Sequence, residues 1–206
     1  MKAFLTFIVF ITFQTTCFSL ELPKDIPAEI APFAEKGTII IAWKSADLNG
    51  DGLSDYLVVL EQQKKNSADP DIKTKQRPVL IILRQLDNSL KLVKRNDIVA
   101  SCSTCSGNRD EGLAEVTATN RSFSISNQTL SKYYLNTDTY VFGYSKRDNT
   151  WQLVRVESNQ EIFAGNGSNI KNIDTPPHGF GKIDFSDFDP EFYIQQGEGY
   201  KPRKRK

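Results

Sequence analysis

The stretch Asp47-Leu-Asn-Gly-Asp-Gly-Leu-Ser-Asp55 separates two apolar runs, Thr38-Ile-Ile-Ile-Ala-Trp43 and Tyr56-Leu-Val-Val-Leu60. Both runs are short and rich in β-branched or aromatic residues. Such runs are typical of strands when they are bounded by Asp, Asn, Gly and Ser. The stretch therefore predicts a strand–loop–strand unit, and this unit indicates that the fold is mainly β.

The loop itself, residues 47–55, carries the oxygen pattern of a site for a hard divalent cation. Side-chain oxygens occupy its first, third, fifth and ninth positions, and Gly52 at the sixth position permits a sharp turn. Calcium takes six to eight oxygen ligands at about 2.3–2.6 Å, main-chain carbonyls included. We predict a bound calcium ion; the alternative is a tight turn without an ion. The predicted ligands are the side chains of Asp47, Asn49, Asp51 and Asp55 and the carbonyl of Leu53.

The residues after the loop distinguish it from an EF-hand, which needs a bidentate Glu at its twelfth position and helices on both sides. Val58 occupies that position, inside a predicted strand. The pattern D-x-N-x-D-G-x-x-D followed by a strand resembles the calcium loops of the FG-GAP and VCBS repeat families, over about residues 38–61. The resemblance implies a β-rich exported or surface protein. Because the pattern occurs once, we do not expect a full propeller.

A longer part of the chain, roughly residues 38–156, is similar to exported bacterial proteins that carry one such loop. The similarity rests on the order of three segments: the loop, then Arg77-Pro-Val-Leu-Ile-Ile-Leu-Arg84, then Cys102-Ser-Thr-Cys-Ser-Gly107. It implies a compact β domain and an envelope location, and it implies no activity.

Further strands are predicted by apolar runs and by alternation. Residues 78–83 are apolar on both faces and predict a central buried strand, whereas residues 122–126 alternate apolar residues with serines. Residues 25–36 carry a helical pattern that Pro32 interrupts. The sequence therefore predicts an antiparallel β-sheet domain with one short N-terminal helix. The other predicted strands are 90–94, 114–119, 140–145 and 151–156, and residues 62–77 and 157–182 are predicted to be irregular.

The N-terminus has the pattern of a secretory signal peptide. Lys2 precedes an apolar run over residues 3–13, which is too short for the roughly 20 residues of a membrane-spanning helix. We predict cleavage after Ser19 and a periplasmic or extracellular location; the alternative is a lipid anchor at Cys17. The predicted organisation is a signal peptide over 1–19, a single β-rich domain over 20–200 and a basic disordered tail over 201–206.

Charge is distributed unevenly along the chain. Five of the six residues in Lys201-Pro-Arg-Lys-Arg-Lys206 are basic, and without these five and Lys2 the chain has 20 basic and 25 acidic residues. An acidic body argues against nucleic-acid binding. The tail is interpreted as a solvated end or as a contact for an anionic surface. No segment after the N-terminus reaches transmembrane length, so we expect no transmembrane segment.

Two cysteines remain after the predicted cleavage, Cys102 and Cys105. An even pair in an exported chain predicts a structural disulfide, which would fix a local turn. A redox pair would need a helix after a strand to lower the pKa of one thiol, and loop residues follow instead. A structural zinc site needs four ligands, and His178 is the only histidine.

The sequence carries none of the common catalytic motifs that we considered, namely G-x-S-x-G, H-E-x-x-H and a Gly-rich phosphate loop. Asp110 and Glu111 could serve a carboxylate-dependent hydrolase, which is the weakest candidate. The leading hypothesis is a non-enzymatic envelope protein with a calcium-stabilised β domain that binds a protein or a cell-wall polymer. The main alternative is a periplasmic inhibitor or immunity protein against a secreted enzyme or toxin. The segment 184–189 has two interpretations. Asp184, Asp187 and Asp189 could form a second acidic cluster of ligands, or they could be a polar face that Phe185 and Phe188 anchor to the core.

Overall fold

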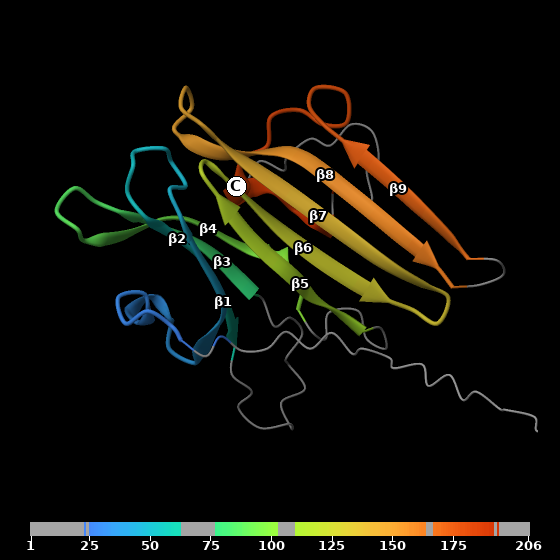
Figure 1. The fold of residues 1–206 in the computed structure, drawn as a ribbon, viewed down its shortest axis with the longest axis horizontal. Helices are drawn as coiled ribbons and strands as arrows, with labels where there is room; N and C mark the ends of the chain where they lie inside the picture. Colours follow the sequence, from blue (N-terminus) through green and yellow to red (C-terminus); the bar gives the residue numbers. More distant parts are fainter. Residues whose placement is uncertain are drawn as a thin grey trace, which may run out of the picture.

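Two antiparallel sheets make up the computed structural model, which describes residues 23, 25–62, 77–102, 110–163, 167–191 and 193. Within these residues, each sheet is a meander in which consecutive strands are neighbours (Figure 1). The predicted mainly β fold is confirmed, and the two sheets do not form a propeller. The four-stranded sheet contains β1 (Thr38–Ala46), β2 (Asp55–Gln62), β3 (Arg77–Arg84) and β4 (Leu90–Ala100). The five-stranded sheet contains β5 (Asp110–Thr119), β6 (Ser122–Leu130), β7 (Tyr134–Ser145), β8 (Thr150–Ile162) and β9 (Ser168–Asp174).

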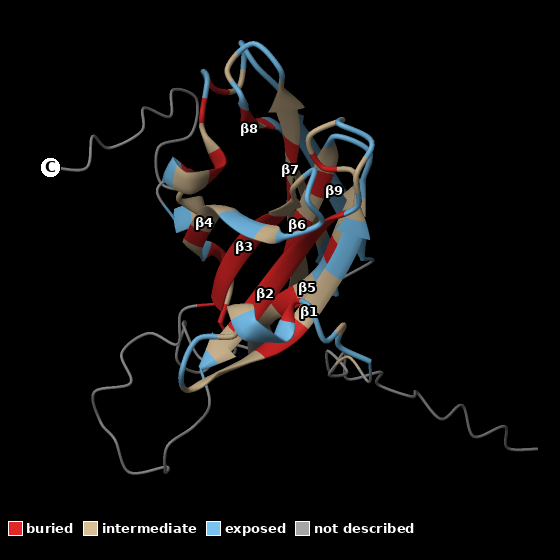
Figure 2. Cartoon of the chain, turned by 90° about the vertical axis from the view of Figure 1, so that its left-hand side faces the viewer, coloured by how far each residue is buried: buried red, intermediate tan, exposed pale blue. Residues whose placement is uncertain are grey.

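The main core lies between the two sheets, and Figure 2 shows the buried residues concentrated along their facing strands. The ring centroids of Phe123 and Phe142 lie 5.2 Å apart in a stacked arrangement, and Phe185 contacts both rings edge-on. Offset and edge-on ring pairs are the favoured aromatic geometries. The opposite sheet contributes aliphatic side chains. Other core members are Ile41, Leu57, Val59, Val79, Ile81, Val116, Ile125, Tyr140, Leu153 and Val156.

A second apolar cluster covers the outer face of the four-stranded sheet. Ile30, from the segment before β1, is buried there together with Tyr56, Val58 and Leu80. Strands β2 and β3 are therefore buried on both faces. This double burial explains why their sequences are continuous apolar runs rather than alternating ones.

The predicted N-terminal helix is reduced to one short 3-10 helix, η1 (Ala31–Phe33). Proline lacks a backbone N–H and cannot continue the hydrogen-bonding pattern of an α-helix, so Pro27 and Pro32 limit the helix to a single turn. Ala34 already has extended dihedral angles. Gly37, with a φ of +83°, then turns the chain into β1.

A second 3-10 helix, η2 (Phe185–Asp187), closes one end of the core. Phe185 and Phe188 are fully buried, which confirms that they anchor this polar segment. Asp184 is the N-cap of η2 and contacts Lys94 and Thr150. No three Asp, Glu, His or Cys side chains gather as a metal-holding group within the described residues, and this holds for Asp184, Asp187 and Asp189 as well as for the three aspartates of residues 47–55.

The prediction that residues 157–182 are irregular is wrong for residues 157–162 and 168–174, whereas residues 175–182 do form turns and irregular backbone. Strand β8 continues to Ile162, and β9 pairs with it from Ser168 to Asp174 without a register shift. The sequence pattern did not indicate β9, because it is an edge strand in which every residue is exposed. Its two isoleucines, Ile170 and Ile173, lie three positions apart and therefore break the alternation of a half-buried strand.

Candidate functional site

The acidic loop, residues 47–55, is the turn of the hairpin that joins β1 to β2. Ala46, just before the loop, pairs with Asp55, the last residue of the loop, so the two ends of the hairpin turn are in register. Gly50 and Gly52 have φ angles of +76° and +89°. These angles are costly for residues that carry a Cβ atom, which explains the two glycines of the motif.

Backbone amides of the loop converge on Asp47. Its Oδ1 accepts hydrogen bonds from the backbone N–H groups of Gly50 at 2.6 Å and Asp51 at 3.1 Å. Its Oδ2 accepts another from Gly52 at 3.0 Å. The first predicted ligand therefore lies on the inner side of the loop and organises its backbone.

Asn49 and Asp51 lie next to each other across the turn. The Oδ1 atom of Asn49 accepts from the backbone N–H of Asp51 at 3.0 Å, and its Nδ2 donates to Asp51 Oδ2 at 2.8 Å. Asp51 Oδ1 accepts from the backbone N–H of Leu53 at 2.8 Å. Three of the predicted side-chain ligands are thus brought together by hydrogen bonds within the loop.

Asp55, the fourth predicted side-chain ligand, turns away from the loop surface. The residue is fully buried, and its two carboxylate oxygens accept from the backbone N–H groups of Leu48 and Arg84, each at 2.9 Å. Burial raises the pKa of this carboxyl, the two backbone hydrogen bonds lower it, and the negative charges of Asp51 and Asp47 add to the rise, so that the net pKa is raised. Asp55 therefore links the loop to β3.

The loop also contacts the five-stranded sheet. Leu48 is buried in the main core, and Trp151 on β8 donates from Nε1 to its carbonyl at 2.8 Å. The backbone N–H of Arg121, in the turn between β5 and β6, donates to the carbonyl of Asp47 at 2.8 Å. The Arg121 guanidinium lies so close to Gly50 that a Cβ there would be 1.9 Å from Nε. The acidic loop is thus a connection between the two sheets.

Of the other predicted site residues, all but one lie within the described part of the chain. Cys102 is buried after the end of β4, and Cys105 lies outside the described residues, so the disulfide stays a prediction. The backbones of Asp110 and Glu111 belong to β5 and pair with β6. His178 is exposed in a turn.

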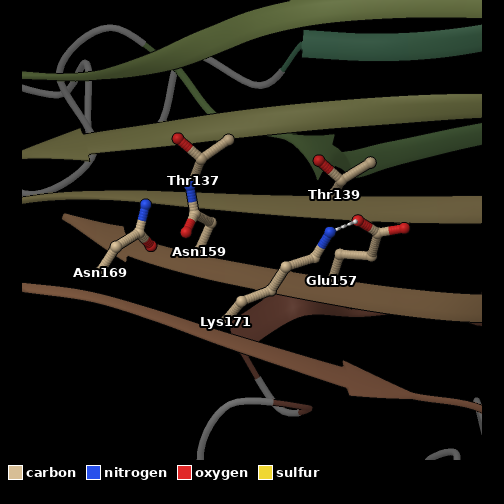
Figure 3. A pocket seen from close by; sticks show the side chains of 6 residues that line it. All are labelled: Thr137, Thr139, Glu157, Asn159, Asn169 and Lys171. Carbon is tan, nitrogen blue, oxygen red and sulfur yellow. Dashed lines mark ion pairs between the residues drawn. The ribbon is translucent and has the colours of Figure 1, made fainter.

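A second polar feature lies on the outer face of the five-stranded sheet. Side chains from β7, β8 and β9 surround a hollow of about 450 Å³, which we call the trough (Figure 3). The strand register places Thr137 beside Asn159 and Asn159 beside Lys171, while Thr139 lies beside Glu157. The lining residues are Thr137, Thr139, Glu157, Asn159, Asn169 and Lys171.

One ion-pair cluster lies at the trough. Glu157 Oε1 accepts from Arg155 Nε at 2.8 Å, and Glu157 Oε2 lies 3.3 Å from Lys171 Nζ. Thr139, which lies across from Glu157 on β7, shares a hydrogen bond of 2.9 Å with Ser126 on β6. The carboxylate is therefore held between two cations on the rim of the trough.

The sequence did not indicate the trough. Its side chains belong to the first half of β7, the second half of β8 and β9, where no strand was predicted. The outward alternation of Thr137 and Thr139 was the one available signal, but the inward residues beside them, such as Asn136 and Asp138, are polar too. A strand with polar residues on both faces gives no period of two.

Comparisons with protein-family models, with curated proteins and with solved structures found no match to this chain. We therefore describe the molecule by its structure alone: it is a two-sheet antiparallel β domain with an acidic hairpin loop and a polar trough. Among the described residues, no helix is long and apolar enough to span a membrane.

Proposed function

We propose that this chain is a non-enzymatic, exported envelope protein that binds a protein or a cell-wall partner through a calcium-stabilised β domain. The observation that carries the binding role is the outer face of the five-stranded sheet. Among the described elements, none packs on this face, and it is hollowed by the trough. Ligand-binding sites are concave, and convergent polar groups in them orient the ligand.

The calcium proposal rests on the geometry of the acidic loop. The carboxylates of Asp47 and Asp51 both accept hydrogen bonds from backbone N–H groups of the loop, and Gly52 provides the turn after Asp51. To ligate the ion, Asn49 would use its Oδ1 atom, which accepts a hydrogen bond from the backbone N–H of Asp51 in this structure. Bound calcium would supply positive charge that offsets the repulsion among these carboxylates. The alternative, an ion-free turn, is supported by the hydrogen bonds that the loop already makes.

Export and the disulfide belong to the same proposal. N-terminal sequencing of protein from an envelope fraction should find a mature chain that begins near Leu20, and intact Met1 in the cytoplasm would contradict export.

Alkylation followed by mass spectrometry should find Cys102 and Cys105 blocked until reduction. Two freely alkylated thiols in the native exported protein would contradict the disulfide.

A pull-down from envelope extract tests the binding role. Immobilised wild-type protein should retain a defined protein or wall polymer, and a variant with Asn159→Ala and Asn169→Ala in the trough should retain less. Retention of a single secreted toxin or enzyme, with loss of that enzyme's activity, would favour the inhibitor alternative. Turnover of a glycan or ester panel by the protein would contradict the non-enzymatic role.

A further inference from the structure

The side chains that line the trough are all polar. All six lining side chains end in hydroxyl, carboxamide, carboxylate or ammonium groups, and none is aromatic or aliphatic (Figure 3). Hydroxyl and carboxamide groups both donate and accept hydrogen bonds. A ligand that fits here must therefore present many groups that donate and accept as well.

Two of the lining groups form no hydrogen bond with any other residue that the structure describes. Within the described part of the chain, the carboxamides of Asn159 and Asn169 make no hydrogen bond to another side chain or to the backbone, although both line the trough. Each carboxamide offers two N–H donors and one oxygen acceptor. Asn159 on β8 lies directly across from Lys171, and Asn169 lies two residues before Lys171 on β9, so a ligand across β8 and β9 would meet both.

The spacing of the lining groups suits an extended ligand. Residues on one face of a strand repeat at about 6.8 Å, and neighbouring strands lie about 4.8 Å apart. The trough therefore presents its groups on a regular grid over three strands. A chain of sugar rings presents hydroxyl and amide groups at regular intervals along its length.

The same composition argues against a protein ligand at the trough. The energetic centres of protein interfaces are enriched in Trp, Tyr and Arg, whereas Lys and Glu are depleted. The trough has Thr, Asn, Glu and Lys.

We propose that the trough binds the sugar chain of a cell-wall polysaccharide. The inference rests on the proposed binding function and names the ligand class at the same face. The carboxamides of Asn159 and Asn169 and the hydroxyl of Thr137 bind sugar hydroxyl and N-acetyl groups.

Co-sedimentation with purified peptidoglycan sacculi tests this inference. Wild-type protein should pellet with the sacculi, and peptide-free glycan strands should release it, whereas free stem peptides should not. Removing the two unpartnered carboxamides, in the variant with Asn159→Ala and Asn169→Ala, should weaken binding about tenfold, because each lost hydrogen bond is worth roughly 0.5–1.5 kcal/mol.

Asn172→Ala is the matched control. Asn172 lies on the same strand as Asn169 and is also exposed, but the register places it on the opposite face of the sheet. Its substitution should leave sedimentation unchanged, and neither variant should alter the melting temperature. Failure of the wild type to pellet, release by stem peptides alone, or equal losses in the two variants would each overturn the inference.

The outcome also separates this inference from the proposed function. If the trough variant loses a protein partner from envelope extract while sacculi never bind, the binding role stands and the sugar ligand is wrong. If neither extract nor sacculi yield a ligand, both are wrong.

Discussion

At the scale of single residues, Asp55 is the predicted ligand whose structural role is clearest. It is fully buried, and both of its carboxylate oxygens accept backbone hydrogen bonds, from Leu48 in the loop and from Arg84 at the end of β3. A motif residue that was predicted to hold an ion therefore also joins two strands. Its position explains why the motif ends in an acid immediately before the apolar run of β2.

We expect Asp55→Ala to lower the free energy of unfolding by about 1–3 kcal/mol, because it leaves buried backbone N–H groups without an acceptor. Urea unfolding in the presence of a chelator measures this effect without any contribution from metal. Asp87→Ala is the control: Asp87 accepts hydrogen bonds from Ser89 in an exposed turn. Equal losses in the two variants would show that Asp55 has no special role.

At the scale of elements, substituting each of the two glycines of the acidic loop distinguishes the cost of backbone strain from the cost of a side-chain collision. Both have positive φ angles, but only at Gly50 would a Cβ collide with Arg121; at Gly52 it meets no atom within 4 Å. Gly52→Ala should cost about 1–2 kcal/mol for the left-handed conformation alone. Gly50→Ala should cost more, because Arg121 must also move. Urea unfolding of both variants measures the difference, and equal losses would mean that the Arg121 contact does not hold the loop.

The short helix η2 depends on Asp184, whose side chain accepts hydrogen bonds from Lys94, Thr150 and the backbone N–H of Ser186. Burial raises the pKa of this carboxyl, but the hydrogen bonds lower it more, so the net pKa lies below its ordinary value. The ionised form is therefore favoured by folding. Its contribution is complete above the unfolded pKa of about 3.9 and is lost as the pH falls through the lower folded value.

Asp184→Ala should accordingly destabilise the protein by about 1.5–3 kcal/mol near neutral pH, as expected for hydrogen bonds to a charged group. The difference from the wild type should shrink as the pH falls below about 4. Urea titrations at several pH values measure it. A difference that stays constant down to the most acidic pH at which the wild type is folded would contradict the assignment.

How far the elements could be predicted depended on where their side chains are buried. Strands β2 and β3 were indicated by their apolar runs, because burial on both faces requires such runs. Strand β9 was not predicted, because an exposed edge strand buries no face and therefore needs no alternation of apolar and polar residues. Local signals also overstated the first helix, since Pro32 opposes the apolar pattern around it.

The acidic loop was predictable only in part. The spacing of its oxygens and glycines is local, so the motif could be read directly from the sequence. The contacts that fix its position come from Arg121 and Trp151, which are far away along the chain and were not predictable from the loop. The trough residues are brought together by strand pairing, so their association became visible only in the structure.

At the scale of the whole molecule, the acidic loop is one of the places where the two sheets are joined. Its ends belong to the four-stranded sheet, while its backbone contacts Arg121 and Trp151 of the five-stranded sheet. Leu48 is buried between them in the main core. An ion bound in this loop would therefore stabilise the relative placement of both sheets rather than a surface turn alone.

We therefore expect calcium to stabilise the entire domain. Binding to the folded state alone adds RT ln(1 + [L]/Kd), about 2.7 kcal/mol at a hundredfold excess over Kd. For a domain of this size the melting temperature should rise by roughly 2–4 °C for each kcal/mol. Differential scanning calorimetry from chelator to about 10 mM calcium covers the range expected for extracellular modules, whose Kd values are roughly 10⁻⁴–10⁻³ M.

Asp51→Ala supplies the decisive comparison for calcium. Asp51 is exposed and contributes only hydrogen bonds within the loop, so its removal should leave the strands intact. The calcium-dependent rise in melting temperature should disappear in this variant and persist in Asp87→Ala, which removes an exposed carboxylate from a different hairpin. If the wild-type melting temperature is the same in chelator and in millimolar calcium, the loop is an ion-free turn. Its hydrogen bonds and its contacts with Arg121 and Trp151 would then account for its role alone.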